Sequence, residues 1–257
     1  MDFTDEQLER YSRHLVLKEV GGAGQVALLN ARVLVIGAGG LGAPLLMYLA
    51  AAGVGTIGII DDDHVELSNL QRQIIHRTQD IGVRKTASAA KRINNLNSDV
   101  KLELHPTRLT PENAEDLIGS FDIIADGCDN FETRHLVNDA CVKLGKTLVS
   151  AALGPYEGQI ATFKPHANSD YPCYRCFLPH TPGEDEQRTC ADTGILGAVA
   201  GVVGSLQALE ILKEILGIGE SLAGKIMLFD ALAMTSRIIG LPKDISCRTC
   251  GSGEGTP

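Results

Sequence analysis

Short apolar runs alternate with longer, partly polar segments along the first 150 residues of the chain. The apolar runs have the length of strands, and the segments between them have the length and spacing of helices. Strands that alternate with helices in this way form a doubly wound α/β fold, so we expect a mostly parallel, Rossmann-like sheet. The predicted strands are residues 32–37, 56–61, 101–106, 121–126 and 147–153, and the predicted helices are 43–53, 84–97, 111–119 and 130–145.

The stretch from Val33 to Ile60 contains no charged residue, and at 28 positions it is long enough to span a membrane. Seven glycines and Pro44 interrupt it, however, and the glycines gather where two turns would fall. Parallel strands that are covered on both faces give continuous apolar runs of this kind. We therefore interpret the stretch as a buried strand, a helix and a second buried strand, and we expect no membrane partner.

The two ends of the chain follow different patterns. Thr4 is a good N-cap with acids after it, so residues 4–17 predict a helix, and a second, shorter one follows. After residue 150 the sequence predicts two strands on either side of a Gly/Ala-rich helix, as an elaborated second half of the same domain. The shorter N-terminal helix is predicted at 24–31, the late strands at 159–163 and 225–232, and the Gly/Ala-rich helix at about 194–216.

The formal charge of −9 argues against nucleic acid or an anionic membrane as a partner, because both would repel the chain. The N-terminal residues MDFTDEQLER lack the cationic and then apolar run of a signal peptide, so we expect a cytoplasmic protein. Seven cysteines are present, and four of them form two C-x-x-C pairs. In a reducing compartment this pattern favours metal or thiol chemistry over disulfides.

A glycine-rich motif, G-x-G-x-x-G, joins the first predicted strand to the helix after it, at residues 37–42. Glycines at this place let backbone N–H groups approach a phosphate at the N-terminus of the helix. Asp61 closes the second predicted strand 24 residues after Gly37, where an acid typically accepts hydrogen bonds from ribose hydroxyls. These features alone support NAD, FAD or ATP about equally.

The polar loop at residues 61–73, DDDHVELSNLQRQ, distinguishes the chain from a nicotinamide-binding protein. It offers the hydroxyl of Ser68 and the amides of Asn69 and Gln71 as groups that can orient phosphate oxygens. Arg72 and Lys85 are well-spaced cations for a triphosphate, although either one alone would more often be a solvated surface charge. We favour the phosphate-binding interpretation because both cations follow a phosphate-binding loop.

A second acidic position follows the predicted strand 121–126, at the edge of the sheet where ligands collect. Asp129 is a candidate to hold Mg²⁺, since hard cations take carboxylate oxygens. Alternatively, Asp129 or Asn130 could only cap the helix that begins there, and both roles can hold together.

The cysteine pairs Cys173/Cys176 and Cys247/Cys250 have the spacing of two zinc knuckles. Two knuckles complete a tetrahedral Cys₄ site, and a zinc ion with no open position would be structural. Two redox dithiols are the alternative, but the flanking context of a thioredoxin motif is missing. Cys190 stands apart in a polar segment before a predicted helix, a setting that favours a reactive thiolate. We interpret the remaining thiols, Cys128 and Cys141, as buried.

Nine segments of the chain together resemble the MoeB/ThiF/HesA family, the bacterial relatives of ubiquitin-activating enzymes. The resemblance spans about residues 5–250, and its most specific elements are SNLQRQ and the double knuckle. The segments are RYSRHLVL, GAGGLG, DDDHVELSNLQRQ, Lys85 on its helix, DGCDN, CYRC, TCADTGILG, GVVGSLQALE and CRTC.

The resemblance implies that ATP, not NAD, occupies the glycine loop. The implied reaction adenylates the C-terminal glycine carboxylate of a small ubiquitin-like sulfur-carrier protein of the MoaD/ThiS type, ending in Gly-Gly, with release of pyrophosphate. It would serve molybdopterin, thiamine or related biosynthesis. Residues 1–257 would then form one adenylation domain, with N-terminal helices (1–30), a nucleotide-binding half (31–150), a carrier-binding and zinc half (151–250) and a flexible tail (251–257).

The resemblance also implies roles for single residues. Arg13 corresponds to an arginine that such proteins lend to the active site of the partner subunit, which implies a homodimer. In ThiF-like members the cysteine that matches Cys190 takes part in sulfur transfer, whereas MoeB-like members adenylate without it. The residues implied against the nucleotide, its phosphates and Mg²⁺ are Gly40, Asp61 (ribose), Ser68, Asn69, Leu70, Gln71, Arg72, Lys85, Asp129 (Mg²⁺) and Asn130.

Two departures from the family pattern affect these expectations. His14 replaces the glutamine that usually follows the arginine, and DGCDN replaces DCTDN, which moves a cysteine by one place. The sequence ends shortly after the second knuckle, so we expect the sulfur donor, a cysteine desulfurase or rhodanese, to be a separate protein. The alternatives are a nicotinamide-dependent oxidoreductase and a non-catalytic carrier-binding adaptor, and the intact set of Arg13, Arg72, Lys85 and Asp129 weighs against the adaptor.

Overall fold

A computed structural model describes residues 3–181 and 194–251. Its eight strands form one sheet of order β3-β2-β1-β4-β5-β6-β7-β8. The pairings from β3 to β5 are parallel, and those from β5 to β8 are antiparallel. The strands are β1 (Arg32–Ile36), β2 (Thr56–Ile60), β3 (Lys101–His105), β4 (Ile123–Asp126), β5 (Thr147–Leu153), β6 (Glu157–Phe163), β7 (Lys225–Asp230) and β8 (Thr235–Gly240).

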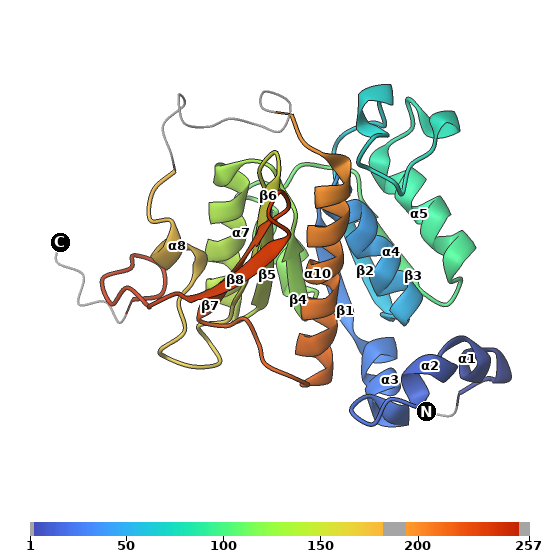
Figure 1. Cartoon of the computed structure of the whole chain (residues 1–257), viewed down its shortest axis with the longest axis horizontal. Helices are drawn as coiled ribbons and strands as arrows, with labels where there is room; N and C mark the ends of the chain where they lie inside the picture. The colour runs from blue at the N-terminus through green and yellow to red at the C-terminus, as the bar shows by residue number, and fades with distance from the viewer. Residues whose placement is uncertain (1–2, 182–193, 252–257) are drawn as a thin grey trace.

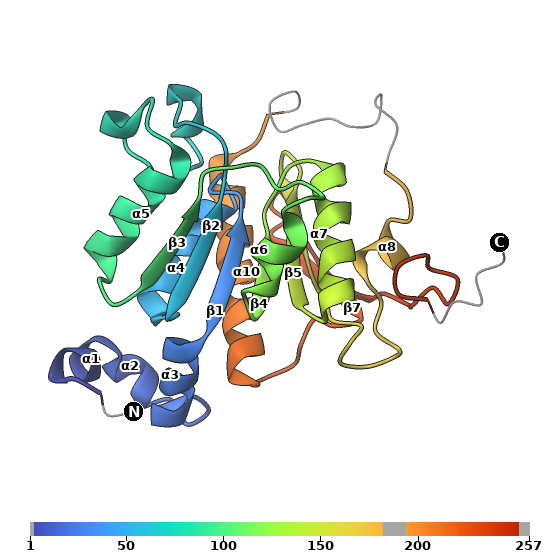
Figure 2. The same cartoon turned by 180° about the vertical axis from the view of Figure 1, so that it is seen from behind.

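Helices cover both faces of this sheet (Figures 1 and 2). On one face α4 and α10 pack against each other, with α5 beside α4, and on the other face α6 packs against α7. The helices are α1 (Asp5–Arg10), α2 (Ser12–Leu15), α3 (Gly21–Asn30), α4 (Gly42–Ala52), α5 (Lys85–Leu96), α6 (Ala114–Gly119), α7 (Phe131–Leu144), α8 (Tyr174–Phe177) and α10 (Gly197–Leu216), with short 3₁₀ turns η1 (Leu67–Asn69) and η2 (Thr78–Asp80). The predicted α/β class with a Rossmann-like sheet is confirmed.

The strand β1 shows why the apolar runs are continuous. Val33 and Val35 belong to the core under α4 and α10, whereas Leu34 and Ile36 belong to the core under α6 and α7. Because successive side chains of a strand point to opposite faces, both sets must be apolar when both faces are covered. Of the described helices, none is both long enough and apolar enough to cross a lipid bilayer.

The N-terminal segment differs from the prediction of one helix over residues 4–17. Thr4 caps α1 with a complete capping box, but the helix ends at Tyr11, whose backbone angles (φ −97°, ψ 10°) interrupt it before α2 begins. The ring of Tyr11 is only 2% exposed, and its hydroxyl accepts a hydrogen bond of 2.9 Å from Asn97. The buried contact of Tyr11 with Asn97, far away in the chain, therefore accounts for the break between α1 and α2. The next helix, α3, begins at Gly21, ahead of the predicted start.

The strand β8 was not predicted from the sequence. All six of its residues are exposed, so the alternation of buried and exposed positions that marks a strand is missing. It pairs with β7 along its whole length and extends the antiparallel part of the sheet. The parallel strands place their carboxyl ends at one rim of the sheet, and the candidate site lies there.

Candidate functional site

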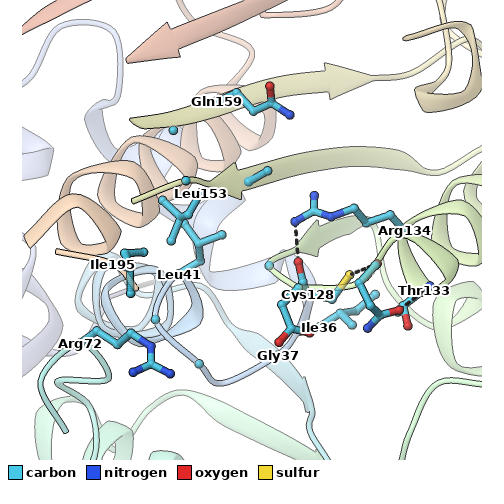
Figure 3. A pocket seen from close by; sticks show the side chains of 18 of the residues that line it. Ile36, Gly37, Leu41, Arg72, Cys128, Thr133, Arg134, Leu153, Gln159 and Ile195 are labelled. Atoms are coloured by element: carbon cyan, nitrogen blue, oxygen red, sulfur yellow. Dashed lines mark hydrogen bonds between the residues drawn. The ribbon is translucent and has the colours of Figure 1, made fainter. Parts of the chain in front are cut away.

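A pocket of about 740 Å³ opens at the carboxyl ends of the parallel strands. It begins at the loop between β1 and α4, passes the ends of β2 and β4, and continues over β6, β7 and β8. In Figure 3, Arg72 and Arg134 lie on opposite sides of the pocket, and Gln159 marks its part over β6. The nucleotide loop that the sequence predicts and the antiparallel part of the sheet therefore share one cavity.

The glycine loop needs glycine at both of its ends. Gly37 has a φ of +94°, a region that other residues rarely adopt. At Gly42 a Cβ atom would lie 2.0 Å from the carbonyl oxygen of Gly37, so a side chain would push the helix away from the loop. Gly40 lines the pocket and lies against Arg72 and Ala200. The loop thus brings backbone into the pocket at the N-terminus of α4, as predicted for phosphate binding.

Three consecutive acids after β2 each hold a group from another part of the chain. Asp61 accepts a hydrogen bond of 2.8 Å from the N–H of Ala38 in the glycine loop. Asp63 pairs with Lys85, the first residue of α5, at 2.8 Å. All three acids line the pocket, and Asp62 lies 3.9 Å from Arg108.

Lys85 is paired within the chain and is mostly buried. Its side chain is only 7% exposed, whereas that of Asp63 is 67% exposed. A buried ammonium group without a partner would be costly, and the pairing with Asp63 offsets that cost.

The polar loop contributes only some of its predicted residues to the pocket. Asn69 and Arg72 line it. Ser68, Leu70 and Gln71 do not: Ser68 is exposed beside Glu66, and the backbone of Gln71 lies against Gly197 at the start of α10.

The segment after β4 places two neighbouring acids in different surroundings. Asp126 is 1% exposed and accepts hydrogen bonds from Ser150 and Arg134 on one carboxylate oxygen and from the N–H of Cys128 on the other. Asp129, in contrast, is exposed and lines the pocket. Asn130 also lines the pocket and caps α7 by accepting from the N–H of Thr133 at 2.9 Å. The predicted cap is therefore present, and it leaves the Asp129 carboxylate available to a ligand.

Arg134 holds this segment from within α7. It is buried and donates to Asp126, to Ser150 and to the carbonyl oxygen of Cys128. Burial opposes the charge of the guanidinium, but several neighbouring groups, with Asp126 foremost, together outweigh this effect and raise its pKa. Cys128, predicted to be buried, is half-buried as a residue and lines the pocket. Its thiol is enclosed by protein, and this burial together with the nearby Asp126 raises its pKa. Cys141 is buried as expected.

Gln73, Arg108 and Arg134 are among the pocket residues that the sequence reasoning did not single out. Gln73 is 4% exposed, and its carbonyl oxygen Oε1 has no hydrogen-bond partner among the described residues. A buried acceptor without a donor is costly in an empty site and is satisfied by a ligand that donates. Arg134 could have been found from its position four residues after Asn130, one helical turn further into α7.

Arg13 is a further predicted site residue that does not line the pocket. Arg13 is exposed on α2, which lies at the end of the molecule away from the pocket (Figure 1). Cys190 falls outside the described residues.

The four cysteines of the two knuckles meet at one point, although the pairs are far apart in the chain. Their sulfur atoms all lie within 4.8 Å of one another, with 3.7 Å between Cys173 and Cys247 and 3.4 Å between Cys176 and Cys250. Zinc–sulfur bonds of about 2.3 Å in a tetrahedron separate the sulfurs by about 3.8 Å. The cluster therefore fits a Cys₄ zinc site. Burial raises the pKa of Cys173 and that of Cys250.

Two neighbouring residues of α7 hold both knuckles in place. Asn138 accepts a hydrogen bond of 2.7 Å from the N–H of Tyr174 and donates to the sulfur of Cys173. Asp139 makes a two-bond pair with Arg175 of the first knuckle and accepts from Thr249 of the second. Hydrogen bonds with Asn138 and Asp139 thus help to orient the four-cysteine cluster.

The fold is a doubly wound sheet with a glycine loop, cations and acids around one pocket. This arrangement is that of a nucleotide-binding α/β protein, and the separate four-cysteine cluster fits a metal site. The ThiF family matches residues 11–249 of the chain. The chain belongs to the ThiF family.

Comparisons with known proteins agree with this assignment. The chain is 46% identical to a sulfur carrier protein adenylyltransferase of Thermus thermophilus, over 98% of this chain and 93% of the relative. It is 45% identical to the SAMP-activating enzyme E1 of Haloferax volcanii, over 96% of this chain and 90% of the relative. Among solved structures, MccB of E. coli in complex with a MccA variant has a TM-score of 0.82 at 23% identity, over 98% of this chain and 76% of that one, which shows the shared fold.

Proposed function

We propose that the protein is an adenylyltransferase that uses ATP to activate the C-terminal glycine carboxylate of a small ubiquitin-like sulfur-carrier protein. The names of its relatives, a sulfur carrier protein adenylyltransferase and a SAMP-activating enzyme, support this function. The activated carrier would then receive sulfur for molybdopterin, thiamine or related biosynthesis.

One observation carries the proposal: a single pocket runs from the glycine loop to the strands β6, β7 and β8. A reaction between a nucleotide and a protein terminus needs both in one cavity, with the two reacting ends in contact. The ATP would lie at the glycine loop, and the extended C-terminus of the carrier would enter over the antiparallel strands, past Gln159, Phe229 and Arg237.

In the proposed reaction the carrier carboxylate attacks the α-phosphate of ATP, and pyrophosphate leaves with the electron pair of the broken bond. Negative charge grows on the transferring and leaving groups, so fixed cations lower the barrier. Arg72 and Lys85 would supply that charge, and Lys85 would exchange Asp63 for a phosphate oxygen. Asp61 would bind the ribose, and further phosphate and nucleotide contacts would come from Gly40, Asn69 and Asn130, which line the pocket. Ser68, Leu70 and Gln71, which the family resemblance also implies, lie outside its lining and are not assigned a contact.

Asp129 would hold Mg²⁺ against the phosphates. Its exposed carboxylate at the pocket wall fits a hard cation, since such cations take carboxylate oxygens and keep several waters. When bound, the ion would neutralise part of the charge on the phosphate oxygens.

The four-cysteine cluster would hold one structural zinc ion per chain. No open coordination position remains when all four sulfurs bind, so the site would stabilise the C-terminal segment without taking part in the chemistry.

Arg13 would act in the site of a partner subunit, which makes the protein a homodimer. This explains why an arginine of the family motif is exposed and remote from the pocket of its own chain. The sulfur donor would be a separate cysteine desulfurase or rhodanese.

Carrier-dependent exchange of labelled pyrophosphate into ATP tests the function. We expect exchange with a carrier that ends in Gly-Gly and none with the same carrier lacking its last glycine, because the shortened tail holds its carboxylate about 3.5 Å short of the α-phosphate. If the protein binds both ATP and the carrier but catalyses no exchange, the result would indicate an adaptor. If it binds NAD(H) and not ATP, the result would indicate an oxidoreductase.

A further inference from the structure

His76 is buried beside the glycine loop and is not used by the proposed reaction. It is 6% exposed, and its two ring nitrogens have different partners. Nε2 lies 3.0 Å from the carbonyl oxygen of Ala38, and Nδ1 lies 2.9 Å from the hydroxyl of Ser88, which in turn lies 3.1 Å from Asp80. A carbonyl oxygen can only accept, so Nε2 carries the proton and donates to Ala38.

Ala38 is thereby held from both sides. Its N–H donates to Asp61 at the end of β2, and its carbonyl oxygen accepts from His76. The residue itself is fully buried, so no water replaces either bond. The conformation of the glycine loop is therefore fixed by two side chains that are 15 residues apart in the chain.

The hydrogen bond from His76 to the carbonyl oxygen of Ala38 determines where the N–H group of Gly39 points. In a trans peptide the N–H of one residue is directed opposite to the carbonyl of the residue before it. The Ala38 carbonyl points at His76, so the N–H of Gly39 points away from His76. Gly39 lines the pocket, and among the described residues no backbone acceptor takes a hydrogen bond from its N–H.

We propose that His76 is a positioning residue, which turns the N–H of Gly39 toward the phosphates of a bound nucleotide by holding the carbonyl oxygen of Ala38. The inference rests on the proposed function only in taking that nucleotide to be ATP. Ser88 supports His76 in this role, because its hydroxyl is hydrogen-bonded to Nδ1 and so fixes the plane of the imidazole ring.

Calorimetric titration of the full chain with ATP and with adenosine tests the proposal. His76→Leu removes the donor at similar volume, and we expect it to raise the Kd for ATP about tenfold, the loss of about one hydrogen bond to a charged group. The Kd for adenosine, which has no phosphate, should stay within about twofold of the wild-type value. His76→Gln keeps an N–H donor and should restore most of the ATP affinity.

Three results would overturn the proposal: a folded His76→Leu protein with wild-type ATP affinity, an equal loss of ATP and adenosine affinity, or a His76→Gln protein as weak as His76→Leu. If His76→Leu does not fold, Ser88→Ala decides, because it removes only a hydroxyl. We expect Ser88→Ala to raise the Kd for ATP about threefold and to leave the Kd for adenosine unchanged. A Kd for ATP equal to the wild-type value would contradict the proposal. Wild-type protein that binds ATP but catalyses no exchange overturns the proposed function alone.

Discussion

Asp126 and Asp129, three positions apart in the chain, are a buried structural acid and an exposed acid that lines the pocket. The carboxylate of Asp126 accepts hydrogen bonds from Ser150, Arg134 and a backbone N–H. Asp129, in contrast, lines the pocket without such partners among the described residues. Because Arg134 also holds the carbonyl oxygen of Cys128, the buried pair fixes the backbone just before Asp129. The buried acid thus orients the exposed one.

We expect Asp129→Ala to lower carrier-dependent pyrophosphate exchange by at least about 100-fold, since the ligand of the metal ion is lost. The fold should be kept, because the exposed carboxylate supports no described packing contact. Exchange assays across a range of Mg²⁺ concentrations check this, with Asp62→Ala as a control acid from the same pocket. Near-normal exchange at saturating Mg²⁺ would remove Asp129 from the metal site.

Acid should destabilise the protein in part through His76. Burial lowers its pKa, Lys85 lowers it further, and the bond to Ala38 with Asp61 and Asp80 only partly offsets this. The unfolded chain therefore binds a proton at His76 below about pH 6.5, where the native state resists it. The contribution of the neutral His76 ring to the free energy of unfolding is therefore full above this pH and is lost as the pH falls.

We expect the free energy of unfolding of the wild type to fall relative to that of His76→Gln between about pH 7 and pH 5, by up to about 1.4 kcal/mol per pH unit. Urea titrations of both proteins at several pH values measure the difference. Stability curves that run parallel over this range would show that His76 does not titrate in this way.

Residues of the site could be predicted from the sequence where a local motif carries them. Gly40, Asp61, Arg72 and Lys85 sit at fixed positions relative to strand ends, and all line the pocket. Gln73 and the pairing of Lys85 with Asp63 could not be predicted, because both depend on which side chains are buried once distant segments meet.

At the scale of elements, α7 joins the two functional regions. Its first turn carries the cap at Asn130 beside the pocket, and Asn138 and Asp139 further along bind the knuckles. Helices are stiff over this length, so the cysteine cluster and the nucleotide pocket share one support.

We expect one zinc ion per chain, and we expect Cys250→Ser to lose it. Metal binding to such sites is coupled to folding, so the melting temperature should fall by about 5–10 °C. Elemental analysis and thermal unfolding measure both effects, with Cys141→Ala as a control thiol outside the cluster. Protein purified without chelator that contains no zinc would contradict the site.

The buried strands were predictable from their apolar runs. The strands β1, β2, β4 and β5 are mostly buried, and their apolar runs predicted them within two residues. β8 was missed because none of its side chains is buried, so only pairing with β7 makes it a strand.

At the scale of the whole molecule, Arg13 decides whether the active unit is one chain or two. If Arg13 serves the partner's pocket, Arg13→Ala and Asp129→Ala proteins should each be inactive and regain activity when mixed. Half of the sites in a mixed dimer would combine an intact pocket with an intact donated arginine. Pyrophosphate exchange after verified subunit exchange measures the recovery, and none is expected if Arg13 serves its own chain.

The switch from parallel to antiparallel pairing at β5 has a consequence for how such a protein can diversify. At the glycine loop and the end of β4, several residues in or beside the pocket are tied to others through buried polar contacts, as Asp126 is to Arg134 and Ser150, so one substitution there disturbs several others. On the side of β8 the residues are exposed, and each can change without disturbing its neighbours. Under the proposed function, descent with modification can therefore redirect the enzyme to a new protein tail while its use of ATP stays constant.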